Sequence, residues 1–301
     1  MKKLIIFNIF FIMALACTYS VAAENPWAEK KKVVTRTYPL RGNQKVSITN
    51  SFGKVNVNNG NRSEVKVEIT ISVSARTDQA AQEILDRIQI DERNSSEISF
   101  ETKFTNNPKG RNNNTKMEIN YEVTLPAQTP LYIKNSFGNT VIPDRSGNTE
   151  LQQSFGDLTT GNLSQLANVK VEFGKFAAEK VDGSRIKASY SDVNIKTLTG
   201  DLKTDFEFCK KLRLGLSNGL QSLTVKTSYS DLQITVPQNF NGNFQINTSF
   251  GKAQGGSFVR LTDQTKEKKY GPTFDRAYTG KTGNGKTNVF INASFGDVRF
   301  N

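Results

Sequence analysis

The sequence predicts an all-β protein: a β-solenoid or β-helix of stacked short-strand repeats, with an N-terminal β module that carries one short helix. Two observations lead to this class. A motif built around an aromatic residue followed by Gly or Ser recurs eight times, and the residues that precede it alternate between apolar and polar, as strands do. Self-similarity at a short, nearly fixed period is the signature of stacked repeats.

The repeated motif is recognised by its aromatic residue. The eight aromatic positions are Phe52, Phe137, Phe155, Phe173, Tyr190, Tyr229, Phe250 and Phe295. From Phe137 onward their spacings are 18, 18, 17, 39, 21 and 45 residues. The spacing of 39 indicates two repeats, with a degraded copy near Phe206 and Phe208.

Within a copy, the apolar positions follow a period of two. Ile186, Ala188 and Tyr190 alternate with polar residues, so they are expected to share one face of a strand. Stacked turn upon turn, the rings should then form an internal ladder, each ring contributing about 1.5–3 kcal/mol by burial. On this interpretation Phe155→Ala costs about 3–5 kcal/mol. The alternative is an exposed row of rings that stacks on sugars.

The N-terminus predicts export. Lys2 and Lys3 precede an apolar run over 4–16, and the small residues 21–23 provide a cleavage site, so residues 1–23 are expected to be a secretory signal peptide. The competing interpretation is lipid anchoring at Cys17, which ends the sequence Ala-Leu-Ala-Cys; we favour cleavage after Ala23. No later segment is apolar enough to span a bilayer as a helix.

The remaining chain divides by its pattern. Residues 24–35 are expected to be a basic linker, residues 36–130 an N-terminal β module with a helix at about 77–88, and residues 131–301 the solenoid, with a loop insertion at 261–287. The helix is indicated by an apolar face at helical spacing, and Asp78 lies near its start.

Composition excludes several chemistries. The chain has no histidine, which removes Ser-His and Cys-His nucleophiles and the commonest zinc ligand. After signal removal only Cys209 remains, so no intramolecular disulfide can form. The aspartates that follow the motif (Asp157, Asp192, Asp231 and Asp297) are expected to be turn formers, because other copies carry lysine there. We predict no catalytic residue, no cofactor-binding residue and no metal ligand.

The net charge of +12 comes largely from basic residues scattered singly along the strands. Examples are Lys170, Lys187, Lys196, Lys203 and Lys226. They are expected to keep solvated faces and strand edges soluble. The functional alternative is attraction to anionic envelope polymers or lipid headgroups. Nucleic-acid binding is not expected of an exported chain.

Residues 280–287 satisfy the phosphate-loop pattern G-x-x-x-x-G-K-T. That loop binds phosphate only between a buried strand and the N-terminus of a helix. Because residues 288–295 alternate as a strand, we interpret this segment as a glycine-rich turn.

Three features carry a resemblance to a known family. They are the recurring Ser-Phe-Gly, the run from Val123 to Pro126 that leads into residues 133–138, and the closing run from Gly283 to Val298. With them the chain resembles the putative adhesin family of bacterial β-strand repeat proteins, a family of unknown function. The resemblance spans most of the mature sequence.

The function expected from these observations is that of a non-catalytic exported envelope protein, a putative adhesin or a surface or periplasmic binding and structural scaffold. Its partners would be envelope glycans or cell-surface or periplasmic proteins, and its location the periplasm, the outer membrane surface or the exterior. One alternative is an envelope-stress or signalling component that acts through a protein partner. A β-helical carbohydrate-active enzyme is the third, and the oligomeric state stays open.

Overall fold

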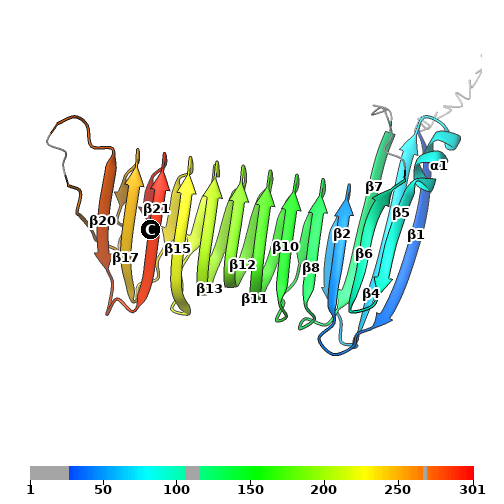
Figure 1. Ribbon diagram of the computed structural model, residues 1–301, viewed down its shortest axis with the longest axis horizontal. Coiled ribbons are helices and arrows are strands. Elements are labelled where there is room, and N and C mark those ends of the chain that lie inside the picture. The colour runs from blue at the N-terminus through cyan, green and yellow to red at the C-terminus, as the bar shows by residue number, and fades with distance from the viewer. Residues whose placement is uncertain (1–26, 106–114, 267–269) are drawn as a thin grey trace, which may run out of the picture.

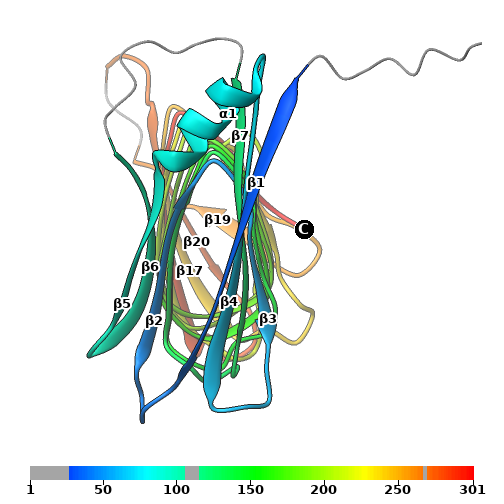
Figure 2. The same cartoon turned by 90° about the vertical axis from the view of Figure 1, so that its right-hand side faces the viewer.

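The computed structural model describes residues 27–105, 115–266 and 270–301, so the predicted signal peptide and Cys17 lie outside the described residues. The protein is all-β, with one helix in the described part of the chain and its strands joined into one hydrogen-bonded sheet. Figure 1 shows a long row of strands, and the end view of Figure 2 shows that this row folds back on itself, with two faces around a narrow interior.

The front face in Figure 1 is a row of mostly parallel strands. In order along the row these are β2 (Lys45–Ser51), β8 (Leu131–Ser136), β10 (Thr149–Ser154), the second halves of β11 (Leu158–Glu172), β12 (Lys175–Ser189) and β13 (Asp192–Glu207), then β15 (Leu220–Ser228), β21 (Thr287–Ser294) and β17 (Gly242–Ser249).

The back face runs in the same order and is also parallel. Its strands are β3 (Val55–Asn59), β9 (Thr140–Ile142), the first halves of β11, β12 and β13, then β14 (Leu212–Gly215), β16 (Leu232–Thr235), β22 (Val298–Phe300) and β18 (Ala253–Gln254). Each front strand passes into its back strand at the aromatic motif, so one motif marks one layer.

Registered pairing places inward residues of neighbouring layers over one another. Val169 is in register with Ile186, and both are fully buried, whereas Lys187, the next residue after Ile186, is exposed. The apolar core is therefore a continuous column between the two faces. Burial along this column is the main stabilising term expected of stacked repeats.

The layers do not follow sequence order at the C-terminal end. β21 pairs with β15 on one side and β17 on the other, so the last segment of the chain inserts between two earlier ones. The expected loop at 261–287 contains strands β19 (Leu261–Asp263) and β20 (Asp275–Lys281). β20 is antiparallel to β17, and its buried Tyr278 covers the end of the core. The expectation of a loop was therefore wrong for residues 261–263 and 275–281. These strands pair with each other and cap the stack, but their irregular composition lacks the alternation that predicts a strand.

The N-terminal end is covered by five further strands, which pair with one another antiparallel and with β2 and β3 in parallel. They are β1 (Ala28–Pro39), β4 (Glu64–Ala75), β5 (Ile88–Asn94), β6 (Glu97–Phe104) and β7 (Thr115–Leu125). The expected linker at 24–35 is wrong from Ala28 onward, because β1 pairs with β4 along twelve residues. None of the side chains of β1 is fully buried, so its sequence shows no alternation of apolar and polar residues that would predict a strand. Exposed Lys31 and Lys32 suit an edge strand that must not pair further.

The helix α1 (Asp78–Asp86) lies within the predicted range of 77–88. Thr77 caps it by accepting a hydrogen bond from the Ala80 N–H at 3.2 Å. Ala81 and Leu85 are buried, and the helix packs against β1 and β4; Figure 2 shows it next to β1. Within the described ranges, no helix has the length and apolar content needed to cross a membrane.

The expected N-terminal module and the repeats that follow it share one hydrogen-bonded stack. β2 pairs in register with β8, and β3 pairs with β9. The layer of β2 and β3 thus belongs to the stack although residues 60–125 separate it in sequence from the next layer. Those residues supply the strands that cover the end.

Candidate ligand-binding face

Nine aromatic residues form a ladder along the corner between the two faces. In stacking order they are Phe52, Phe137, Phe155, Phe173, Tyr190, Phe208, Tyr229, Phe295 and Phe250. All nine have a left-handed backbone, with φ between 51° and 65°. The degraded copy expected near Phe206 and Phe208 is Phe208.

The expectation of an internal ladder was wrong. The nine side chains are 37–53% exposed, and the rings lie outside the core. The period of two holds only while the backbone stays extended, and a residue with positive φ turns the chain away from that path. Ala188 therefore points inward, whereas Tyr190, two residues later, points outward.

The rings stack face to face. Neighbouring centroids are 4.7–5.2 Å apart and the planes differ by 2–8°. Phe104 packs edge-on against the first ring, and Phe274 stacks on the last at 4.6 Å. Because each face is covered by the next ring, the ladder presents ring edges to solvent. The alternative expectation of an exposed row agrees with this exposure, but sugar stacking needs open ring faces, which the row lacks along its length.

The residue after each ring decides how closely the layers approach. At Gly156 an added Cβ would overlap the carbonyl of Gly138 in the layer before it. Three middle layers have Ser191, Cys209 or Ser230 at this position, and these side chains are buried. The Ser191 hydroxyl donates to the Ser189 carbonyl at 2.7 Å, so in these layers a side chain fills the corner.

The aspartates of the motif bind the neighbouring layer. Asp231 Oδ1 accepts from the Asp297 N–H at 2.9 Å, and Asp297 Oδ1 accepts from the Lys252 N–H at 3.0 Å. These bonds link adjacent layers, so the two carboxylates have a structural role between layers, whereas the expected role was to form a turn within one layer. Among the described residues, no group of three or more His, Cys, Asp or Glu side chains is placed to hold a metal ion.

The fold gathers five basic side chains on the front face. Lys170, Arg185, Lys187, Lys203 and Lys226 come from β11, β12, β13 and β15, and we call them the basic strip. Lys170 is in register with Lys187, and Arg185 with Lys203. Each of these two pairs places like charges on adjacent strands, about 4.8 Å apart, whereas Lys226 lies two strands from Lys187.

The basic strip borders a groove of about 230 Å³. Its lining is Arg185, Lys187, Lys203, Thr204, Asp205, Thr224 and Lys226. Thr224 is in register with Lys203, and this short side chain beside long ones leaves the hollow open. Asp205 lies between Lys187 and Lys226 and is in register with both.

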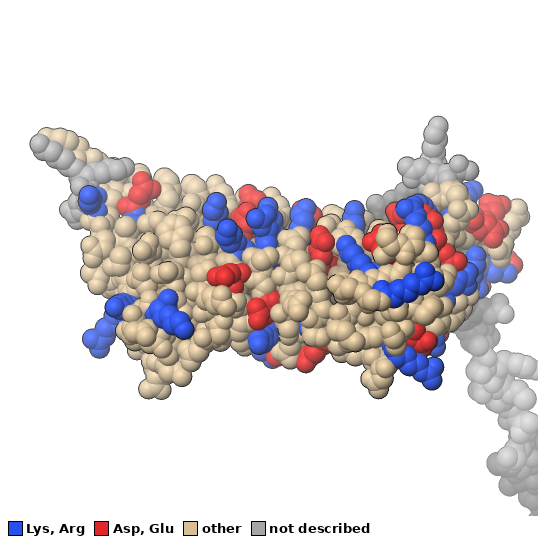
Figure 3. Space-filling model, turned by 60° about the horizontal axis from the view of Figure 1, so that its bottom comes forward, with Lys and Arg blue, Asp and Glu red and all other residues tan. Residues whose placement is uncertain are grey.

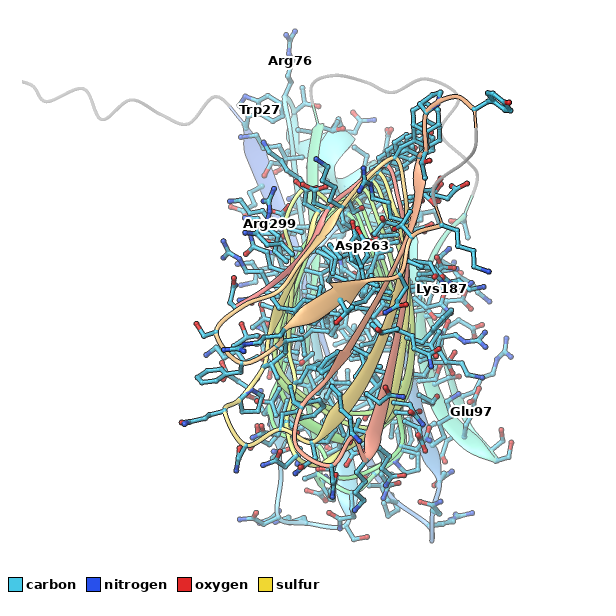
Figure 4. All side chains as sticks on the ribbon, turned by 90° about the vertical axis from the view of Figure 1, so that its left-hand side faces the viewer. Trp27, Arg76, Glu97, Lys187, Asp263 and Arg299 are labelled. Carbon is cyan, nitrogen blue, oxygen red and sulfur yellow. The ribbon has the colours of Figure 1, made fainter. Side chains whose placement is uncertain are left out.

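The charges of the strip are poorly compensated. Lys170 pairs with Glu172 at 3.0 Å, whereas the other four basic residues make no ion pair in the described part of the chain. Like charges on adjacent strands destabilise a sheet, so Lys170 beside Lys187 and Arg185 beside Lys203 do not stabilise the fold. Figure 4 shows Lys187 on the front face and Arg299 on the opposite one.

A buried arginine lies elsewhere and is structural. Arg145 is 1% exposed, donates to the Thr129 carbonyl at 2.7 Å and to Asn59 Oδ1 at 3.2 Å, and has no described carboxylate partner. Burial lowers its pKa to about 10. The guanidinium thus ties the end of β3 to the segment just before β8.

The phosphate-loop pattern at 280–287 forms a turn. Gly280 belongs to β20, and Thr287 begins β21, which is a strand. No helix N-terminus is present there to receive a phosphate, as expected from the sequence.

The basic strip is the feature that sequence reasoning missed as a cluster. Lys170, Lys187, Lys203 and Lys226 were each named as single solvated residues. Aligning the repeats on their aromatic residues would have shown that Lys170 and Lys187 each occupy the third position before the ring. The parallel register is what converts that shared position into spatial neighbours.

No family model matches the chain, and no curated protein matches it. Solved structures do. A putative cell adhesion protein from Clostridium sporogenes is 13% identical, with 90% of this chain and 99% of that chain covered and a TM-score of 0.24. A putative adhesin from Bacteroides fragilis is 10% identical, with 90% and 97% covered and a TM-score of 0.41. A putative lipid binding protein from Parabacteroides distasonis is 10% identical, with 89% and 96% covered and a TM-score of 0.33.

Putative adhesins are thus among the structures that this chain is similar to, in agreement with the resemblance that the repeated motif carries. With TM-scores below 0.5, these similarities carry no argument about function.

Proposed function

We propose that the chain is a β-solenoid that serves as a non-catalytic, exported binding scaffold of the cell envelope, an adhesin or a periplasmic structural protein. The observation that carries this proposal is the stack of layers in register, which produces two long faces whose outward side chains are repeated from strand to strand. A rigid face of this kind lets many weak contacts add up along one partner.

The grooves of the molecule are open and shallow, and they suit surface contact. One of about 620 Å³ lies at the C-terminal end of the front face, and half of its lining residues are Asn, Ser or Thr. Figure 3 shows another view, in which charged side chains are densest toward the N-terminal end.

The solenoid is tested by removing one layer. Deletion of residues 156–173 joins Phe155 to Gly174 and removes one repeat from corner to corner. A solenoid should retain its circular dichroism spectrum and shorten by about 4.8 Å in small-angle scattering. Deletion of residues 156–164 removes about half a layer and should unfold the protein. Equal damage from both deletions contradicts the repeat model.

The location is tested by protease treatment of intact cells. Release of peptides from this chain before those of a periplasmic control supports contact at the cell surface. Protection until the outer membrane is opened supports a periplasmic scaffold or a signalling role through a protein partner. Retention in the cytoplasm contradicts the proposal.

A further inference from the structure

We propose that the basic strip on the front face binds a linear acidic polysaccharide that lies along the row of strands. The inference rests on the proposed function and names the class of partner. It starts from the unpaired charge: Arg185, Lys187, Lys203 and Lys226 surround one groove and form no ion pair among the described residues.

The direction of the strip matches a polymer. Along the long axis of the molecule, Lys170 lies beside Lys187 and Arg185 lies beside Lys203, at the spacing of neighbouring strands, about 4.8 Å. Lys226 lies two strands beyond Lys187, with Asp205 between them. Lys134 of β8 continues the row of Lys170 and Lys187, with Gln152 between. An extended chain with regularly placed anionic groups can contact successive layers, and each added contact raises the affinity without a deep pocket.

The neutral and acidic members of the groove favour a sugar. Thr224 offers a hydroxyl donor and acceptor, and the Asp205 carboxylate only accepts hydrogen bonds. A ligand that carries hydroxyl groups between its anionic groups can satisfy both. A purely anionic ligand would meet Asp205 as a repulsive neighbour.

The surroundings of the strip disfavour a membrane surface. Glu172 and Glu207 lie in the row between the basic strip and the aromatic ladder. These two carboxylates separate the strip from the exposed ring edges, so anionic headgroups that met both would be repelled there. The strip itself carries no apolar side chain that could enter a bilayer.

The test compares two triple variants of equal charge change. The front variant is Lys187→Gln, Lys203→Gln and Lys226→Gln; the back variant is Lys175→Gln, Lys196→Gln and Arg213→Gln, all exposed on the opposite face. Binding of the purified full chain to polygalacturonate is measured by calorimetry at two salt concentrations, with neutral dextran as the uncharged control. Circular dichroism checks that each variant is folded.

The front variant should lose about tenfold in affinity, as three exposed charge contacts together predict, while the back variant should stay within about twofold. The affinity of the unchanged chain should fall as salt is raised, and dextran should not bind. Equal losses in both variants would reduce the effect to net charge and overturn the proposal. So would absence of polygalacturonate binding, or binding only to vesicles of phosphatidylglycerol.

These outcomes are separate from the proposed function. A chain that protease treatment places at the cell surface but that ignores polygalacturonate remains a scaffold with another partner. A chain that binds polygalacturonate but stays in the cytoplasm contradicts the scaffold role.

Discussion

The interior of the stack and its aromatic corner both contain aromatic rings, but those of the interior form the core and those of the corner stack at the surface. Phe206 is fully buried in the core, whereas Phe208, two residues later, is 38% exposed and stacked between the rings of its neighbouring layers. The two differ because Phe208 has a φ of 53° and so leaves the extended path of β13. The comparison teaches that backbone handedness at one residue, rather than apolar character, decides which rings build the core.

The largest expected effect separates these two rings. Phe206→Ala should lower the free energy of unfolding by about 3–5 kcal/mol, because it empties a packed core site. Phe208→Ala should cost about 1–2 kcal/mol, because 38% of that residue is already exposed and only stacking and partial burial are lost. Urea unfolding followed by circular dichroism measures both. The same reasoning reduces the cost expected for Phe155→Ala from about 3–5 kcal/mol to about 1–2 kcal/mol.

Phe208→Gly sharpens the comparison. Glycine takes positive φ without strain, so this variant should be no less stable than Phe208→Ala despite its smaller side chain. Equal losses for Phe206→Ala and Phe208→Ala would mean that the corner rings are as buried as the core, contrary to the geometry.

The second effect compares the two kinds of corner. Gly156→Ala should cost about 1–3 kcal/mol, because the new Cβ meets the Gly138 carbonyl and must push two layers apart. Ser191→Ala should cost about 1 kcal/mol, the net value of a hydroxyl hydrogen bond, since a Cβ is already accommodated there. Thermal unfolding of the two single variants under identical conditions provides the measurement. A more damaging Ser191→Ala would show that hydrogen bonds, rather than close approach, set the corner.

The sequence predicts the repeat, the helix and a degraded copy near Phe206 and Phe208, because these depend on local patterns. It does not predict that Phe295 stacks between Tyr229 and Phe250, since that order arises from β21 pairing with two strands distant in sequence. It also hides β1, whose contribution is backbone pairing with β4 rather than apolar burial. The sequence shows the members of the basic strip only as scattered basic residues. Their clustering depends on the register between neighbouring strands, which the order of residues along the chain does not give.

The smallest expected effect lies at the opposite corner, where the chain returns from the back face to the front. There Asp144 replaces ring stacking by hydrogen bonds: its carboxylate accepts from the Asn162 N–H at 2.7 Å and from Asn162 Nδ2 at 2.8 Å. The backbone bond first, and the side-chain bond second, lower the pKa of Asp144 below its ordinary value of 3.8. The carboxylate is largely exposed, so its effect on stability is small.

The sign of the pH dependence follows from that lowered pKa. Folding favours the ionised form, so the stabilisation is fully present above the ordinary pKa and is lost as the pH falls through the lowered one. Asp144→Asn should therefore lower the urea midpoint at pH 6, and the difference from the unchanged chain should shrink as the pH falls below about 4. Asn162→Ala removes only the side-chain donor and should show the same trend at smaller amplitude. A difference that stays constant from pH 6 to the most acidic measurable point would mean that Asp144 acts through its shape and not its charge.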